Sequence, residues 1–135
     1  MILGTVPDTV GVSLGMLELH GVDLDCRGTL IIHKDSVWGF WIKVITLGHE
    51  TNEGVNMTAP PVDRPVIVDK DAWICSCAQL YNCHIGEGAI VTFGTVVRSQ
   101  EVKPYTMVAG NPARVIAHWD GQDWVYVGSK FEVLE

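Results

Sequence analysis

Large aliphatic residues recur at intervals of six positions through the middle of the chain. They occupy Val68, Ile74, Leu80, Ile85, Val91 and Val97. The interval shortens to five residues once, between Leu80 and Ile85. A helix repeats every 3.6 residues and a half-buried strand every two, so this interval indicates a repeated unit of one short strand and one turn. Because one such unit cannot bury a face alone, we expect the units to stack around a shared core.

Small residues stand two positions before most of these aliphatic residues, namely Ala72, Ala78, Cys83, Ala89 and Thr95. A weaker form of the interval comes earlier, with His20 where an aliphatic residue is due, at Leu14, Cys26, Ile32, Trp38 and Val44. Terminal units of a repeat are commonly atypical because they cap the stack. We therefore predict an all-β domain whose coils cover residues 11–50 and 65–116.

Two segments lie outside the repeat. Residues 51–64 contain Pro60 and Pro61 and show no periodicity. A loop of this length in a compact domain is usually functional or disordered, so we predict a projecting loop here. Residues 117–135 form a tail in which Trp124, Tyr126 and Val133 predict short strands. We expect this tail to cap the last coil or to exchange with a neighbouring copy.

The composition limits the class of protein. A length of 135 residues allows one domain with a sizeable core, and 14 glycines favour a turn-rich β protein. A net charge of −7 argues against nucleic acid as a partner. We find neither a secretory leader nor an apolar run of 18 residues in the sequence, so we expect a cytoplasmic protein that has no membrane partner.

The cysteines allow two interpretations. Three of the four fall inside the repeat, which favours reduced and buried thiols. The alternative is a zinc site made from Cys75, Cys77, Cys83 and His84. Its spacing matches none of the usual paired-cysteine zinc motifs, so we expect no metal.

The end of the repeat and one earlier segment resemble the hexapeptide-repeat acyltransferases. Residues 104–116 read Pro-Tyr-Thr-Met-Val-Ala-Gly-Asn-Pro-Ala-Arg-Val-Ile, which is similar to the closing signature of that family. Residues 45–49 read Ile-Thr-Leu-Gly-His and resemble the segment with its catalytic histidine. The resemblance covers about residues 14–116 and is greatest to the maltose, galactoside and exopolysaccharide O-acetyltransferases. It implies a left-handed parallel β-helix that forms homotrimers, with active sites between subunits.

The resemblance implies that acetyl-CoA is the acyl donor and His49 the catalytic base. A histidine near neutrality can remove the proton of an acceptor hydroxyl, whose oxygen then attacks the thioester carbonyl. A second group should fix the tautomer of His49 or bind the acceptor. We expect this role for Asp23 or Asp25, ahead of Glu50, which would face away from His49 in a strand. A backbone carbonyl is a further candidate.

The acyl donor should lie along the later coils. Residues 73–76 resemble a Trp-Ile-Gly-Ser segment of the family, which implies that Trp73 lies near the acceptor or the pantetheine and that Ser76 contacts the donor. Residues 91–95 align with a family segment that implies donor contacts for Gly94 and Thr95. Two residues depart from the family pattern: Cys75 replaces glycine, and Phe93 replaces an alanine beside the pantetheine. The donor's phosphates need cations, for which we expect Arg98, Lys103 and Arg114.

We therefore predict an acetyl-CoA-dependent O-acetyltransferase that acts on a sugar or a related small hydroxyl compound. An antibiotic acetyltransferase of the same class is an alternative, and so is a non-catalytic coil that has lost CoA binding through Cys75 and Phe93. The γ-type carbonic anhydrases share the coil but hold zinc with two histidines five residues apart and a third one coil away. No two histidines in this chain have that spacing.

Overall fold

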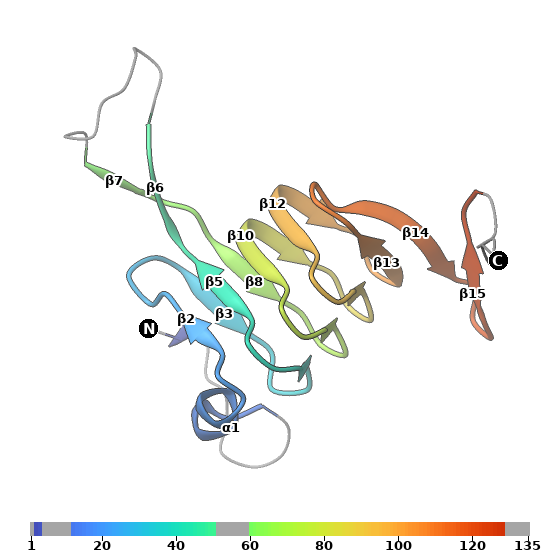
Figure 1. Cartoon of the computed structure of the whole chain (residues 1–135), viewed down its shortest axis with the longest axis horizontal. Coiled ribbons are helices and arrows are strands. Elements are labelled where there is room, and N and C mark those ends of the chain that lie inside the picture. The colour runs from blue at the N-terminus through green and yellow to red at the C-terminus, as the bar shows by residue number, and fades with distance from the viewer. Residues whose placement is uncertain (1, 4–11, 51–59, 129–135) are drawn as a thin grey trace, which may run out of the picture.

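The computed structural model describes residues 2–3, 12–50 and 60–128. The middle of the predicted loop, residues 51–59, and the predicted strand position Val133 lie outside the described residues. Short parallel strands wind into a coil with three faces, and a two-stranded arm leaves it (Figure 1). In the part of the chain that the structure describes, we find no helix with the length and apolar character needed to cross a membrane.

Three faces of the coil follow from the strand pairing. The first face contains the first halves of two long strands and two shorter ones, in the order β2 (Asp23–Leu24), β5 (Lys43–Ile45), β10 (Gln79–Ile85) and β12 (Val96–Val102). The second face contains the second halves of β10 and β12 and three shorter strands, β1 (Ile2–Leu3), β3 (Leu30–Ile32) and β8 (Val66–Val68). The third face contains β4 (Val37–Trp38), β9 (Trp73–Ile74), β11 (Ile90–Val91) and β13 (Thr106–Ala109).

Each of the later coils takes 17 residues rather than 18. Val66 pairs with Cys83, and Cys83 pairs in turn with Gln100. The short corner lies between the first and second faces, where Asn82 and Ser99 adopt φ values of 48° and 50°. A single left-handed residue turns the chain there, which explains the shortened interval between Leu80 and Ile85. The same corner recurs one coil later, although the interval from Val97 alone did not indicate it.

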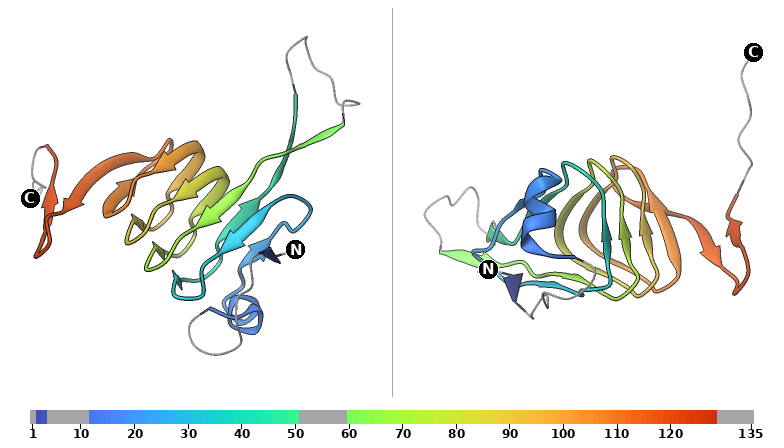
Figure 2. Two further views of the ribbon diagram at one scale, coloured as in Figure 1. Left: turned by 180° about the vertical axis from the view of Figure 1, so that it is seen from behind. Right: turned by 90° about the horizontal axis from the view of Figure 1, so that it is seen from below.

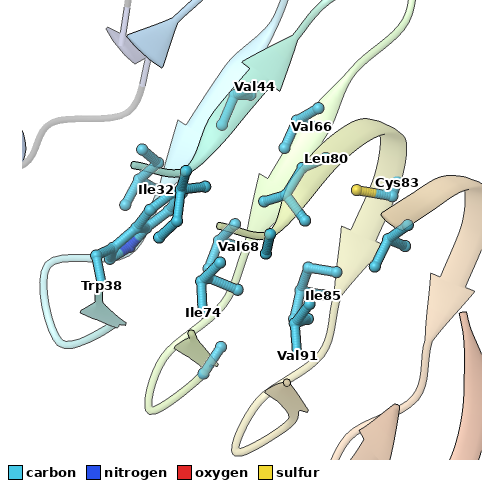
Figure 3. Close-up of a cluster of buried hydrophobic side chains, with 14 of the residues drawn as sticks. Ile32, Trp38, Val44, Val66, Val68, Ile74, Leu80, Cys83, Ile85 and Val91 are labelled. Carbon is cyan, nitrogen blue, oxygen red and sulfur yellow. The ribbon is translucent and has the colours of Figure 1, made fainter. Parts of the chain in front are cut away.

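The core is a stack of the predicted aliphatic residues (Figure 3). All six predicted positions are at most 1% exposed: Val68, Ile74, Leu80, Ile85, Val91 and Val97. The small residues Ala72, Ala78, Ala89 and Thr95 are fully buried where the chain turns between faces. Cys83 differs from them because it stands inside β10 opposite Val66 and points into the core as a strand residue.

The start of the described coil departs from the predicted repeat. Residues expected to form a β-strand unit form a short helix, α1 (Leu14–Leu19), which begins after Ser13. The Ser13 hydroxyl accepts a hydrogen bond from the Met16 N–H, as an N-cap residue does. Leu14 is 60% exposed, so its predicted core position is wrong, and Leu17 is buried in its place. His20 is fixed by its Nδ1–H, which donates to the Trp38 carbonyl at 3.0 Å.

The arm begins where β5 ends, and Figure 1 shows it extending away from the coil. Strand β6 (Leu47–His49) pairs antiparallel with β7 (Pro61–Asp63). The second of these strands falls inside the predicted loop, so residues 61–63 are extended and paired rather than irregular. The residue opposite His49 is Pro61, a proline that ladder pairing tolerates at an edge.

The C-terminal tail begins as an antiparallel hairpin. Strand β14 (Arg114–Trp119) pairs with β13 and with β15 (Trp124–Tyr126), which confirms the predicted strand at residues 124–126. Trp119 and Trp124 are directly opposite each other, with ring centroids 5.7 Å apart. This hairpin reaches beyond the last coil (Figure 2).

The stacked core predicts that truncating an inward residue of the third face lowers the free energy of unfolding far more than truncating an outward residue on the neighbouring strand. We expect Ile74→Ala to lower the free energy of unfolding by about 2–5 kcal/mol, because Ile74 is fully buried between coils. Val37→Ala is the matched control, since Val37 is 55% exposed and should cost no more than about 0.5 kcal/mol. Urea denaturation measures both, and equal losses would contradict the assigned core.

Candidate functional site

A groove runs along the outside of the first face across successive coils. It has a volume of about 460 Å³ and is lined by Lys43, Ile45, Gln79, Leu80, Tyr81, Val96, Arg98 and Asn111. Lys43 and Arg98 are exposed cations, and the described lining contains no carboxylate. Cationic lining of this kind attracts phosphate groups.

His49 lies on the strand that continues out of this face. In β5, Lys43 and Ile45 point outward while Val44 points into the core, and Figure 1 shows β6 extending along the same direction. Side chains alternate along an extended strand, so the exposed His49 falls on the same side as Lys43 and Ile45. The predicted base is therefore at the surface, beyond the edge of the groove.

The first coil holds the base of the arm through Asp25. Its carboxylate accepts a hydrogen bond from the Thr46 N–H at 3.0 Å and pairs with the Arg27 guanidinium at 2.7 Å. Hydrogen bonding from Arg27, joined by the Thr46 N–H, holds the pKa of Asp25 well below its usual range despite the opposing effect of burial. The side chain is only 9% exposed. The Asp25 carboxylate is thus occupied by the arm's backbone and by Arg27, and its role as an orienting group or acceptor ligand remains a prediction.

The third coil contacts the other side of the arm. The Tyr81 hydroxyl lies against Gly48 so closely that a Cβ at this glycine would overlap it. Hydrogen bonding to Tyr81, and to a smaller extent to Glu50, raises the pKa of the Arg64 guanidinium. The Glu50 carboxylate is 3.1 Å from Nη2 of Arg64. Glu50 therefore interacts with Arg64 at the outer surface of the arm.

Asp23 is exposed on β2 and stands opposite Lys43, which lines the groove. Unlike Asp25, it remains available at the surface of the first face. The structure therefore separates the two predicted carboxylates: Asp23 borders the groove, and Asp25 supports the arm.

Three predicted donor contacts lie at the corner between the third and first faces. Gly94 has a φ of 68° and open space around its Cβ position, and its N–H donates to the Ser76 carbonyl. The Ser76 hydroxyl accepts a hydrogen bond from the Phe40 N–H at 3.0 Å. Thr95 is fully buried, and its hydroxyl is 2.9 Å from the Thr92 hydroxyl. The Thr95 hydroxyl therefore lies inside the coil, and a donor contact at this residue remains a prediction.

Trp73 belongs to a different surface. It lines an apolar groove of about 520 Å³ on the outside of the third face, together with Val37, Asp71, Gly88, Ile90, Tyr105, Trp119 and Trp124. Because the arm leaves the corner between the other two faces, one chain does not bring Trp73 to His49. Phe93 is 74% exposed at its turn and fills no channel within a single chain.

The predicted cations are also dispersed. Arg98 lines the first-face groove, and Arg114 is exposed at the start of β14, after the last coil. Lys103 follows β12 at the corner between the second and third faces. A single chain therefore brings only Arg98 into the groove described above.

The alternative zinc ligands do not converge. Cys83 points into the core, where burial raises the pKa of its thiol to about 12. The adjacent His84 points outward and its Nε2 lies 2.7 Å from Asp69. Among residues 2–3, 12–50 and 60–128, no cluster of three or more metal-ligating side chains is found.

Sequence reasoning missed several residues that shape the site. Lys43 and Tyr81 line the groove, and Arg64 and Thr46 form the base of the arm. Strand alternation from the buried Val44 could have identified Lys43, since the two are neighbours. The contacts of Thr46 and Arg64 depend on the adjacent coils and have no local sequence signal.

Comparisons with known proteins show which sequences and folds this chain is similar to. No protein-family model matches the chain. A 2,3,4,5-tetrahydropyridine-2,6-dicarboxylate N-acetyltransferase of Staphylococcus aureus (strain bovine RF122 / ET3-1) is 43% identical over 58 residues, 42% of this chain and 24% of the relative. The Enterococcus faecalis (strain ATCC 700802 / V583) enzyme of the same name is 38% identical over 77 residues, 56% of this chain and 31% of the relative. The chain thus spans about a quarter to a third of the length of these relatives.

Solved structures share the fold. A galactoside acetyltransferase in complex with coenzyme A has a TM-score of 0.63 at 18% identity, covering 80% of this chain and 57% of that chain. A maltose O-acetyltransferase from Clostridium difficile 630 has a TM-score of 0.59 at 23% identity, with coverage of 70% and 50%. Identities this low establish a common fold and no more.

The fold is that of the hexapeptide-repeat acetyltransferases, and the predicted resemblance to this family is confirmed in both structure and sequence. The solved structures include the maltose and galactoside enzymes that the sequence indicated. The curated relatives bear the name of N-acetyltransferases instead.

The depressed pKa of Asp25 predicts how its contribution to stability depends on pH. A carboxyl with a lowered pKa in the folded state stabilises the fold above its unfolded-state pKa of about 4, and this stabilisation is lost as the pH falls through the folded value. We expect Asp25→Asn to be destabilising by a constant amount from pH 7 to about 4, and by progressively less in stronger acid. Urea denaturation at each pH measures the difference; a difference that persists unchanged in strong acid would contradict this assignment.

Proposed function

We propose that this chain is an acetyl-CoA-dependent O-acetyltransferase that acts on a hydroxyl of a sugar or a related small acceptor, with His49 as the general base. The observation that carries the proposal is the position of His49, which lies at the surface at the end of the strand leaving a cationic groove. The acetyltransferase names of both the curated relatives and the structural neighbours support the reaction class.

In this proposal the imidazole of His49 removes the proton of the acceptor hydroxyl as the oxygen attacks the thioester carbonyl. The new C–O bond forms, the C–S bond breaks, and the sulfur of CoA leaves with the proton carried by His49. Assistance from a general base is typically worth about 10²–10⁴-fold in rate. Holding the acceptor and the thioester together supplies the remaining acceleration.

The first-face groove is suited to the acyl donor. Arg98 and Lys43 provide positive charge without a competing carboxylate in the described lining. The open turn at Gly94 and the neighbouring Ser76 form the adjoining corner, where the sequence places donor contacts. Asp23 borders the groove beside Lys43 and is our candidate for an acceptor ligand.

The complete site requires more than one copy of the chain. His49 and Trp73 lie on different sides of the coil, so Trp73 would join the acceptor site from a neighbouring copy. Lys103 would reach the donor in the same way, while Arg114 lies at the end of the coil. Exposed aromatic residues at the corner and on the third face, such as Trp41 and Phe93, are suited to contacts between copies. We therefore propose a homotrimer of left-handed coils with active sites between subunits, acting in the cytoplasm.

Acetyl transfer to an amine is the second candidate. It is favoured by the two curated relatives, which bear the name of N-acetyltransferases and match 38–43% of the aligned residues. Release of CoA thiol in the presence of matched panels of sugars and amino acids separates the two acceptors. Turnover of amines alone would refute O-acetylation and support acetyl transfer to nitrogen.

His49→Ala tests the proposed base. We expect kcat to fall by about 10²–10⁴-fold while acetyl-CoA binding is retained, because the groove is left intact. His84→Ala is the matched control, since His84 is an exposed histidine on the second face, paired with Asp69. Unchanged turnover in His49→Ala, measured by thiol release, would remove His49 from the mechanism.

Arg98→Gln tests the donor groove. We expect the KM for acetyl-CoA to rise about tenfold, equivalent to about 1.4 kcal/mol of lost phosphate interaction. Lys70→Gln removes an exposed cation outside the groove and should leave the KM unchanged. CoA should also raise the melting temperature of the wild-type chain. No shift at saturating CoA would favour the alternative of a coil that has lost donor binding.

A further inference from the structure

The arm that carries His49 is fixed at its base by a closed set of hydrogen bonds. The chain leaves the coil at Thr46 and returns at Arg64, whose N–H donates to the Thr46 carbonyl at 2.8 Å. Thr46 is fully buried. Strand β6 therefore starts from a residue that is fixed in the coil, three positions before His49.

The first coil determines how Thr46 is oriented. The carboxylate of Asp25 accepts the Thr46 N–H at 3.0 Å, and the Thr46 hydroxyl donates to the Asp25 carbonyl at 3.0 Å. The same hydroxyl accepts the Gly28 N–H at 2.9 Å. A Cβ at Gly28 would overlap the Thr46 carbonyl oxygen, so the two segments are in close contact. Both the backbone and the side chain of Thr46 are thus bound to one neighbouring coil.

The returning strand is tied to the same coil. The Asp63 carboxylate accepts the Thr29 N–H at 2.8 Å and the Thr29 hydroxyl. On the opposite side, Tyr81 of the third coil contacts Gly48 and Arg64. The arm is consequently held between the coil before it and the coil after it.

We propose that Asp25 is a positioning residue for His49, which it holds in place beyond the edge of the groove by accepting a hydrogen bond from the Thr46 N–H. This inference rests on the proposed function. His49 lies about 10 Å along an extended strand from Thr46, so a 15° change in direction at Thr46 moves it by about 2.6 Å. A misplacement of about 1 Å can cost about 10²-fold in rate. A carboxylate that never contacts the reactants can therefore control turnover.

Two substitutions at Asp25 test the proposal. Asp25→Ala removes the acceptor of the Thr46 N–H, and we expect kcat to fall about 10–10²-fold. The KM for acetyl-CoA and the thermal shift with CoA should remain within about twofold of wild type, because the groove is unchanged. Asp25→Asn keeps an oxygen for Thr46 and should recover most of the lost kcat. A purely structural role would predict neither this kcat-specific loss nor its rescue.

Asp120→Ala is the matched control. Asp120 accepts backbone N–H groups from Gln122 and Asp123 in the C-terminal hairpin, so it has the same kind of role far from the arm. We expect its kcat to equal that of wild type. A similar loss in Asp120→Ala, or a loss in Asp25→Ala that appears in the KM instead of kcat, would overturn the proposal.

Hydrogen exchange separates this inference from the proposed function. The amides of Thr46 and Leu47 should exchange at least tenfold faster in Asp25→Ala than in wild type, whatever reaction the chain catalyses. Unchanged exchange would refute the hold on the arm, whereas faster exchange with no acetyl transfer by wild type would refute the proposed function alone. If Asp25→Ala does not fold, the same measurement is made on Asp25→Asn, whose amide is a weaker acceptor. Faster exchange of the Thr46 amide would support the hold on the arm, and unchanged exchange would refute it.

Discussion

The structure depends on the superposition of equivalent residues from one coil to the next. Val66, Cys83 and Gln100 follow one another in register on the second face, as do Trp73, Ile90 and Met107 on the third. Each coil is too short to enclose its own apolar residues, so burial is achieved only between coils. Any insertion must therefore leave the stack at a corner and return to the same register, because a shift of one residue would reverse the inward and outward faces.

The arm satisfies this constraint. It departs and returns at the corner between the first and second faces, where Asn82 and Ser99 make a one-residue turn in the later coils. Thr46 and Arg64 close the excursion with a backbone hydrogen bond, so the coil continues as though the insertion were absent. A long extension that carries the candidate base can thus be accommodated without disturbing the core. The cost is that its direction must be fixed by contacts from adjacent coils.

The sequence predicted the parts of this molecule that repeat. The six-residue interval identified the buried aliphatic residues, since each has the same surroundings in every coil. It failed where tertiary contacts replace the repeat: Leu14 belongs to a helix, and residues 61–63 pair with β6. The position of His49 on an exposed strand end could be expected from its segment. The hydrogen bond of Asp25 could not, because its partner Thr46 is 21 residues away and is brought close only by the pitch of the coil.

The two ends of the described coil differ in how they finish the stack. Helix α1 places Leu17 against the core at one end, and at the other β14 runs antiparallel to β13. A parallel stack can lengthen indefinitely if its last rung offers a parallel neighbour, as fibrous assemblies do. The reversal at β14 withdraws that template on the third face, where the hairpin with β15 extends past it, whereas β12 is the last described strand of the other two faces. A further coil could therefore not continue the parallel ladder of the third face beyond β13.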